Sequence, residues 1–235
     1  PLRPSEEIFQ KVQQVPGVVA LTPYILSQAM ITSETNVHGV VLRGIDSRTA
    51  GRVINIEKIL KKGVMGNLDA LDPVSGQPGI FIGNELARTL GVLMGDAVIV
   101  VSPTATLSPL GGGPPMKKFR VAGIFESGMY EYDTSLVYIS LENAQKFLAM
   151  EGTVTGIEVR VEDIYNVKQV AEKIRRALGF PFWTKDWMEM NRSLFAALKL
   201  ERTVMFIILV LIVLVAAFGI VSSLIMVVME KNKDI

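Results

Sequence analysis

The side chains that could do covalent or acid–base chemistry are few in this sequence. Its 235 residues include no cysteine and one histidine, which excludes disulfides, thiolate metal clusters, a cysteine nucleophile and multi-histidine metal sites. His38 has no serine or carboxylate partner at a spacing typical of a catalytic site, so we interpret it as an ordinary strand residue. Glu126, Glu131 and Asp133 could pair for glycoside cleavage, but we interpret them as carboxylates that solvate a loop.

Sequence signatures for phosphate and nucleic-acid binding are also absent. No G-x-x-x-x-G-K-S/T string occurs, so we do not expect this chain to hydrolyse nucleotides. Three consecutive glycines at 111–113 are followed by prolines, which lack N–H donors for a phosphate. The formal charge of +1 gives no basic bias toward a polynucleotide. We therefore predict no catalytic residue, no metal site, no cofactor and no nucleic-acid partner.

A proline- and glycine-rich stretch at 102–118 is the one soluble segment that local structure does not explain. It lies between two β-rich stretches, 97–102 and 119–125, and is therefore expected to form the tip of a hairpin. Four prolines stiffen it and remove N–H donors that would invite unwanted strand pairing. No acidic residue occurs between positions 97 and 125.

This stretch has the features of a preorganised docking finger. Leu107 and Leu110 are apolar residues at positions where water is expected. Lys117, Lys118 and Arg120 at its base could attract an acidic partner surface. The alternative is a merely solvated loop that binds nothing.

The C-terminal region predicts a membrane-spanning helix. The mean hydropathy of +0.37 is high for a soluble domain, and the apolar excess is concentrated at 204–229, where 26 residues follow one another without a charge. At about 1.5 Å per residue this run reaches roughly 39 Å, more than the ~30 Å hydrocarbon core of a bilayer. Basic residues flank the run on both sides, so their count does not decide its orientation.

The first 203 residues alternate between helical and strand patterns, which predicts an α+β fold with helices on one face of a sheet. The expected helices are 5–15, 85–90 with Asn84 as cap, 141–148 with Ser140 as cap, 166–178 and 183–202. The expected strands are 18–32, 37–45, 79–83, 97–102, 119–125, 136–139 and 156–161.

The order of these elements predicts a domain with an insertion. Because 46–125 interrupts two sets of similar elements, we predict one subdomain formed by 1–45 and 126–187 and a second one inserted at 46–125. An amphipathic connecting helix over 188–203 then leads into the apolar run at 204–229.

Three sequence motifs resemble those of one known family. They are VSPTATLSPLGGGPPMKKFRVAGIF at 101–125, GIFIGNELARTLGVLMGD at 79–96 and SSLIMVVMEKNKDI at 222–235. The chain resembles the LolC/LolE family of lipoprotein-releasing permeases over nearly its whole length, and the first motif is the most specific. The last residues of the chain, 230–235, look like the start of the cytoplasmic coupling segment of the wider family that includes MacB and FtsX.

The resemblance implies a protein of the bacterial inner membrane with its large domain in the periplasm. The split part would be the family's Porter subdomain, the insertion its mainly-β Sabre subdomain with a protruding hairpin, and 204–229 the second transmembrane helix. The first transmembrane helix and two later ones would be missing here, so we expect a fragment of a longer protein. A separate ATPase subunit, LolD, would hydrolyse ATP, so the chain itself is not expected to be an enzyme.

The resemblance also implies a partner site at the hairpin tip, a hook that captures the periplasmic carrier LolA. The hook would cover 104–115, with its apex near Pro109, and a carrier-contacting pad would follow it. Lysine stands where the family's pad has an arginine. A lysine ammonium lacks the planar pair of N–H donors with which a guanidinium makes a bidentate contact. The implied hook and pad residues are Thr104, Leu107, Pro109, Leu110, Gly111, Gly112, Gly113, Pro114, Pro115, Met116, Lys117 and Lys118.

The implied function is that of a permease subunit that extracts triacylated lipoproteins from the membrane and passes them to the carrier. Removing acyl chains from a bilayer costs ~0.8 kcal/mol per CH₂, so the process needs both an apolar shelter and ATP hydrolysis. The candidate lipid-contacting residues are Leu194, Leu198, Met205, Phe206 and Leu209. This helix face could equally pack against a neighbouring helix, and the second permease subunit would be either a copy of this one or a relative.

Two other functions fit the same residues. A MacB-like efflux or mechanotransmission subunit would share the helix and the α+β domain but needs no proline-rich finger. A membrane-anchored extracytoplasmic sensor or binding domain would instead gain thermal stability from a ligand and would continue into a signalling domain after Ile235.

Overall fold

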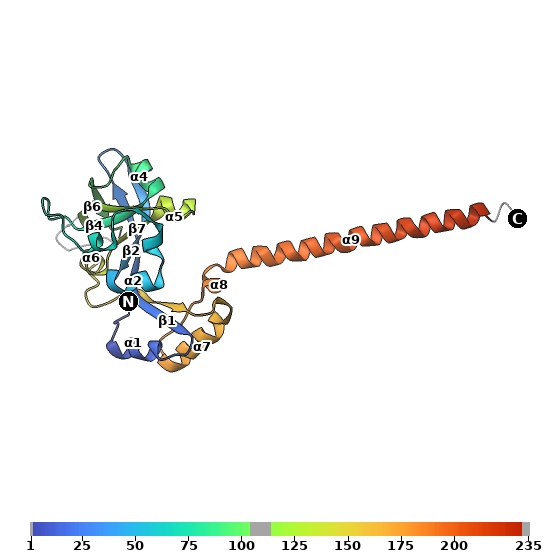
Figure 1. Ribbon diagram of the computed structural model, residues 1–235, viewed down its shortest axis with the longest axis horizontal. Helices are drawn as coiled ribbons and strands as arrows, with labels where there is room; N and C mark the ends of the chain where they lie inside the picture. The colour runs from blue at the N-terminus through green and yellow to red at the C-terminus, as the bar shows by residue number, and fades with distance from the viewer. Residues whose placement is uncertain (1, 104–113, 232–235) are drawn as a thin grey trace. The chain divides into compact units, whose positions relative to one another are not determined.

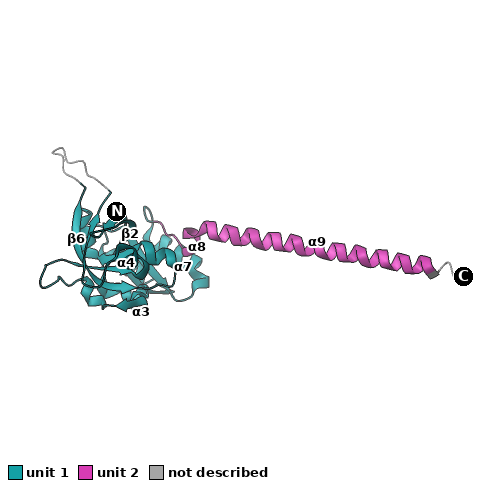
Figure 2. Cartoon of the chain, turned by 90° about the horizontal axis from the view of Figure 1, so that it is seen from above, with its two compact units in different colours: residues 1–182 teal, residues 183–235 magenta. Residues whose placement is uncertain are grey.

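The computed structural model describes residues 2–103 and 114–231 of the chain. It has two compact units, Pro1–Phe182 and Trp183–Ile235, drawn in teal and magenta (Figure 2). The first unit is an α+β domain with a β-sheet at its centre, and the second is helical (Figure 1). The predicted fold class, a mixed α+β domain followed by one apolar helix, is therefore confirmed.

The strands all belong to the first unit. They are β1 (Val18–Thr32), β2 (Val37–Ile45), β3 (Leu60–Lys62), β4 (Gly79–Gly83), β5 (Ala97–Val101), β6 (Met116–Phe125), β7 (Leu136–Ser140) and β8 (Gly156–Val161). Its helices are α1 (Glu6–Gln13), α2 (Ser47–Val53), α3 (Ile56–Ile59), α4 (Asn84–Leu90), α5 (Tyr130–Ser135), α6 (Leu141–Phe147) and α7 (Val167–Leu178), with 3-10 turns η1 (Met65–Leu68) and η2 (Ile164–Asn166). The sequence patterns missed α2, α3, α5, β3 and both 3-10 turns. α3, β3 and the 3-10 turns have only three or four residues, too few for a full helical period.

The strands form one sheet that closes on itself. Its hydrogen-bonded order is β2-β7-β4-β6-β5-β1-β8, and β1 also pairs with β2, so a ring forms from β1, β2, β7, β4, β6 and β5. The length of β1 makes this closure possible. Its second half pairs with β2 from Tyr24↔Ile45 to Thr32↔Val37 and with β5 near Met30, while its first half pairs with β8.

Alternate residues of these strands face the inside and the outside of the ring. In β4, Ile80 and Ile82 belong to the largest core cluster together with apolar residues of α4 and α6. Phe81 points the other way, into a second cluster with residues of α2, α3 and η1. The expectation of helices on one face only is therefore wrong: both sides of β4 are covered, and its five residues are all buried.

The packing does not follow the expected subdomain boundaries. The largest core cluster combines residues of 1–45, 46–125 and 126–187, because β2 and β7 are hydrogen-bonded into the same ring as β4. A smaller cluster joins α1, the first half of β1, β8 and α7 around Val12, Val170 and Ile174. If the first unit were divided by its cores, the boundary would fall in the middle of β1. The expected boundaries at residues 45 and 126 do not separate one core from another.

Local sequence signals at the helix ends are mostly as expected. The Ser5 and Ser140 hydroxyls accept backbone N–H bonds at the starts of α1 and α6. Gly91 ends α4 with a φ of 67°, a conformation that favours glycine. The expected cap Asn84 is wrong, because α4 begins at Asn84 and is preceded by Gly83, which has no side chain. A Cβ at Gly83 would lie 2.1 Å from the carbonyl oxygen of Asp133, so only glycine fits there.

The second unit contains α8 (Trp187–Met190) and α9 (Arg192–Lys231). The expected helix over 183–202 is interrupted, since the Asp186 side chain caps a single turn and Asn191 then leaves the helical conformation. From Arg192 the helix runs without a break through the connecting segment and the apolar run. Its 40 residues reach roughly 60 Å at 1.5 Å per residue, and its length and composition suffice to cross a membrane.

Candidate functional site

The base of the β5–β6 hairpin is the part of the predicted partner site that the structure describes. β5 and β6 pair antiparallel from Ala97↔Arg120 to Val101↔Met116, and the Ser102 N–H donates to the carbonyl oxygen of Pro115 at 2.9 Å. A hairpin is therefore confirmed, with β6 beginning three residues earlier than expected. The predicted hook residues Thr104, Leu107, Pro109, Leu110, Gly111, Gly112 and Gly113 lie outside the described residues.

The three predicted pad residues do not share one face. Met116 and Lys118 are exposed on the outer side of β6, whereas Lys117 points to the side of the largest core. Lys117 Nζ donates to Asn143 Oδ1 at 2.8 Å and lies 5.6 Å from the centre of the Phe119 ring. Partial burial lowers the pKa of Lys117. Lys117 thus ties β6 to α6, and Met116 and Lys118 are the pad residues available to a partner.

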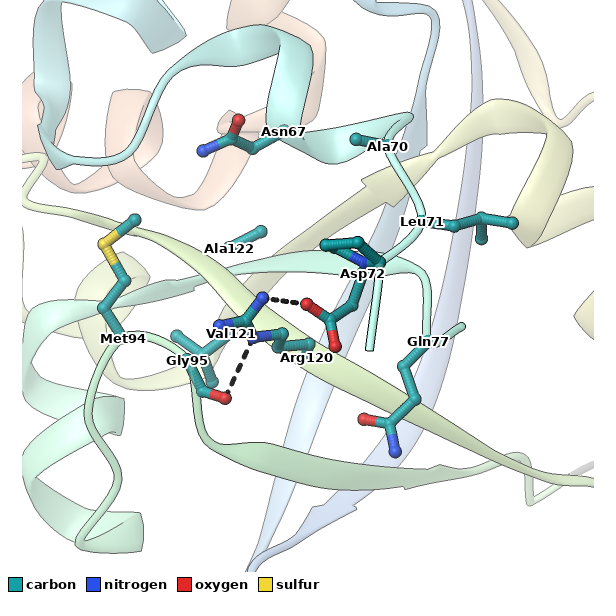
Figure 3. A pocket seen from close by; sticks show the side chains of 12 residues that line it. Asn67, Ala70, Leu71, Asp72, Gln77, Met94, Gly95, Arg120, Val121 and Ala122 are labelled. Atoms are coloured by element: carbon teal, nitrogen blue, oxygen red, sulfur yellow. Dashed lines mark hydrogen bonds and ion pairs between the residues drawn. The ribbon is translucent and has the colours of Figure 1, made fainter. Parts of the chain in front are cut away.

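Arg120 lies at the edge of a hollow of about 240 Å³ beside the hairpin (Figure 3). Its guanidinium forms an ion pair with Asp72, and its Nε donates to the carbonyl oxygen of Gly95 at 3.1 Å. The Ser75 hydroxyl and backbone N–H, at 2.6 and 2.9 Å, also bind the Asp72 carboxylate. These bonds and the nearby Arg120 lower the pKa of Asp72.

The Arg120–Asp72 pair changes the predicted electrostatics of the hairpin base. Asp72 matches the Arg120 charge within the domain, and Lys117 is half-buried. Of the three predicted cations, Lys118 is therefore the best placed to meet a partner. Sequence reasoning missed Asp72, although the Asp-Pro-x-Ser-Gly pattern at 72–76 is typical of a turn in which the first carboxylate binds backbone N–H groups.

Among the residues weighed for catalysis, Asp133 takes part in the packing of the fold. His38 is half-buried in β2 opposite Ile31. The expectation that Asp133 solvates a loop is wrong, since it is 4% exposed in α5 and its Oδ1 accepts the Ser127 N–H at 2.8 Å. Glu126 Oε2 lies 3.4 Å from Lys61 Nζ. Within residues 2–103 and 114–231, no three or more His, Asp or Glu side chains are grouped so that they could hold a metal ion.

The predicted lipid-contacting residues all lie on α9. Their exposed fractions range from 50% for Leu198 to 67% for Phe206. At roughly 100° per residue, Leu194, Leu198, Met205 and Leu209 fall within an arc of about 60°, so they form a stripe along one side of the helix. Phe206 lies roughly 60° outside that arc by the same spacing.

Comparison with known proteins identifies the family of the folded unit. The family model described as "MacB-like periplasmic core domain" matches residues 2–177. The chain is 38% identical over 220 residues to the "Lipoprotein-releasing system transmembrane protein LolC" of Xylella fastidiosa, covering 94% of this chain and 52% of that protein. It is 35% identical to the protein of the same name from Neisseria meningitidis, covering 93% and 52%. The chain spans about half the length of the curated relatives it matches.

More distant similarities also exist. The "Lipoprotein-releasing system transmembrane protein LolE" of Haemophilus influenzae is 23% identical over 232 residues, covering 98% of this chain and 54% of that protein. Among solved structures, the extracellular domain of the ABC-type transporter YknZ from Gram-positive bacteria covers 74% of this chain and 81% of its own, at 18% identity and a TM-score of 0.49.

These findings fit an inner-membrane protein with a periplasmic domain, since the matched family is periplasmic, the relatives are transmembrane proteins and α9 is long and apolar enough to span. With its family model matched from residue 2 to residue 177, the chain belongs to the family of the MacB-like periplasmic core domain.

Proposed function

We propose that this chain is part of the permease subunit of a lipoprotein-releasing ABC transporter in the bacterial inner membrane. In this proposal the periplasmic domain passes lipoproteins to a soluble carrier of the LolA type. The observation that carries the proposal is the exposure of Met116 and Lys118 directly after the proline-rich segment, in a chain 38% identical to a LolC protein. The proposal is further supported by the absence of acidic residues between positions 97 and 125, which suits an acidic carrier surface.

The hook would consist of 104–115, with Pro109, Leu110 and Gly111 as its apex. Prolines limit the conformations of a free loop, so binding would cost less conformational entropy than the ordering of a flexible loop. Met116 would add an adaptable apolar contact and Lys118 an exposed positive charge. Lys117 would act from behind, by holding β6 against α6 through Asn143.

The lipid would be sheltered along the stripe of Leu194, Leu198, Met205 and Leu209, with Phe206 beside it. Transfer of an acyl chain out of the bilayer costs ~0.8 kcal/mol per CH₂, which is why a separate LolD-like ATPase is required in this proposal. A second permease subunit, a copy or a relative of this one, would complete the shelter. Crosslinking from positions 194 and 205 to a bound lipoprotein tests this part separately from the hook.

The hook is tested by the double substitution Pro109→Asp and Leu110→Asp in the full chain, reconstituted in lipid nanodiscs. Binding of a purified LolA-type carrier is measured by biolayer interferometry. We expect at least a tenfold loss of affinity, about the effect of removing one interface hot spot. The matched control is Val74→Asp, since Val74 is 93% exposed on another loop. Unchanged binding by the double variant would remove the hook, and a MacB-like efflux role would then be favoured.

A further inference from the structure

A second hollow lies on the outer side of the ring, at the end of β6 that is far from the hook segment. Its volume is about 300 Å³, and its lining includes Phe125 of β6 and Leu136 and Tyr138 of β7. The Phe125 and Tyr138 rings contact each other edge to face, with their centroids 5.3 Å apart. Phe125 and Met116 are the two ends of β6, so they lie roughly 30 Å apart at about 3.3 Å per residue. We call this site the β7 hollow.

Two short segments of the chain flank the β7 hollow. One contributes Ile54, Asn55 and Ile59, around α3, and the other contributes Met129 and Tyr132, at the start of α5. Met129 and Tyr132 are 54% and 48% exposed, so the hollow is bordered by large side chains that solvent reaches. A mostly apolar lining with a few polar groups is typical of sites for small molecules, whose volumes begin at about 300 Å³.

Arg43 of β2 is the charged residue of this lining, and it lies opposite Tyr138 in the sheet. Its Nη2 forms an ion pair with Glu158 of β8, and its guanidinium lies 5.6 Å from the centre of the Tyr24 ring. The Arg43 Nε is buried and has no acceptor among the residues that the structure describes. Because a buried N–H group normally has a partner, this one indicates an acceptor that the domain itself does not supply.

The charge balance at Arg43 indicates which kind of acceptor fits. Since Glu158 already matches the guanidinium charge, a ligand carboxylate would place a second negative charge beside the same cation. An ester or amide carbonyl oxygen accepts an N–H bond without adding a charge. An apolar lining with one donor for an uncharged carbonyl therefore matches a fatty acyl group that is joined through an ester or amide bond.

We propose that the β7 hollow binds one acyl chain of the lipoprotein, whose ester or amide carbonyl accepts the Arg43 Nε–H. This inference rests on the proposed function. A phospholipid offers the same ester-linked chains, but it carries a charged phosphate beside them, and the guanidinium of Arg43 is already paired. The triacylated end of a lipoprotein carries its chains on amide and ester groups without that phosphate, so it fits the lining better.

The inference assigns roles to two residues that the sequence did not single out. Arg43 becomes a ligand-binding residue, and Glu158 becomes a positioning residue that holds the guanidinium in place. Each methylene that leaves the bilayer must be kept from water, so an apolar hollow in the periplasmic domain would lower the cost of the transfer. The β7 hollow would hold part of one chain, in addition to the stripe on α9.

Photo-crosslinking tests the site in the unchanged full chain in lipid nanodiscs. The probe is a synthetic triacylated cysteine peptide with a diazirine group in one acyl chain, and labelled peptides are identified by mass spectrometry. We expect label on 54–59 and 127–138, in addition to label on α9. A phosphatidylethanolamine with the same diazirine chain should label the hollow about fivefold less or weaker still, because its phosphate finds no unpaired cation there.

Two substitutions test how the chain is held. Ile59→Trp, at a half-buried position of the lining, should fill the hollow and remove its label while the label on α9 remains. Val64→Trp, at a 62% exposed site outside the lining, is the matched control. Arg43→Lys keeps a positive charge for Glu158 but lacks the Nε–H, so half-saturation of the label should need about threefold to tenfold more probe. Arg160→Lys, exposed on β8, is its control.

The outcomes separate this inference from the proposed function. Label in the hollow that Ile59→Trp removes, with an unchanged melting temperature, supports the inference. Label on α9 without label in the hollow overturns the inference and leaves the proposed function standing, whereas label on neither contradicts both. Equal labelling by the phospholipid probe would overturn the assignment to lipoproteins. Unchanged half-saturation in Arg43→Lys would overturn the role of Arg43.

Discussion

β4 and the apolar run of α9 contain the same kinds of residue but meet opposite surroundings. All five residues of β4 are buried, whereas Leu214 and Phe218 in α9 are 47% and 65% exposed. In β4, burial removes apolar surface from water at about 25 cal/mol per Å² and so stabilises the fold. In α9 the same surface remains free for lipid, so it determines where the chain resides. Apolar composition alone therefore does not distinguish a core strand from a membrane anchor; length and periodicity do.

Of the substitutions that test this comparison, Phe81→Ala is expected to have the largest effect. Phe81 is fully buried between β4 and the helices α2 and α3, so its removal should lower the free energy of unfolding by about 3–5 kcal/mol. Urea unfolding of the full chain in detergent, followed by circular dichroism, measures this. Val74→Ala, at a 93% exposed position, should change the stability by less than about 0.5 kcal/mol. Similar small losses for both variants would contradict the assigned core.

The next largest effect is expected in α9, from Leu214→Arg in the middle of the apolar run. An arginine at the centre of a spanning helix costs about 2.5–3.5 kcal/mol of insertion free energy, so less of the chain should enter the membrane. Membrane flotation of the expressed chain measures the inserted fraction. The urea midpoint of the first unit should not change, and Leu214→Ala should insert normally. Full insertion of Leu214→Arg would argue against a lipid-exposed position.

A smaller effect is expected from removal of the Asp133 carboxylate, which is buried in the first unit. Asp133→Ala removes a buried carboxylate, leaves the half-buried N–H of Ser127 without its acceptor and should cost about 1–3 kcal/mol. Asp133→Asn retains an acceptor oxygen and should lose less. Equal losses in urea unfolding would show that the hydrogen bond is not what Asp133 contributes.

The smallest effect is expected from Asp72→Asn, in the hollow beside the hairpin. The folded-state pKa of Asp72 is lowered by Ser75 and Arg120, so its stabilising effect is present above the ordinary value of 3.8 and is lost as the pH falls through the folded-state value. Asp72→Asn should therefore lower the melting temperature slightly at pH 7, and the difference from the unchanged chain should vanish in strong acid. Melting temperatures between pH 2 and pH 7 test this; a difference that persists in acid would contradict it.

Local pattern was a good guide to the elements of the first unit. The β-branched residues of 18–32 and 37–45 and the short apolar runs at 79–83 and 136–139 predicted strands that the structure contains. Ser5 and Ser140 correctly predicted the starts of two helices, because the hydroxyl of a residue before a helix accepts a hydrogen bond from a free backbone N–H of the first turn. The prediction of Asn84 as a cap was wrong, because Gly83 occupies the cap position and the backbone of Asp133 leaves no room there for a side chain.

The candidate site was harder to predict than the elements. The pad at 116–118 was expected within the hairpin tip, but β6 begins at Met116, so successive side chains point to opposite sides. That turned Lys117 toward Asn143 and left Lys118 outside. Arg120 found its partner 48 residues earlier in the chain, at a distance that no local motif encodes.

The sequence by itself determined most local features of this protein: which longer stretches are strands and helices, where the apolar run lies and where prolines are concentrated. The longer elements follow from side-chain periodicity and backbone restrictions within a few residues, whereas α2, α3, α5 and β3 were not apparent from the sequence. The tertiary structure alone decided that β1 closes a ring, that both sides of β4 are covered and that one part of the outer side stays open. Those outcomes depend on the register between strands far apart in the chain, and a shift of one residue would turn every side chain of a strand to the other side.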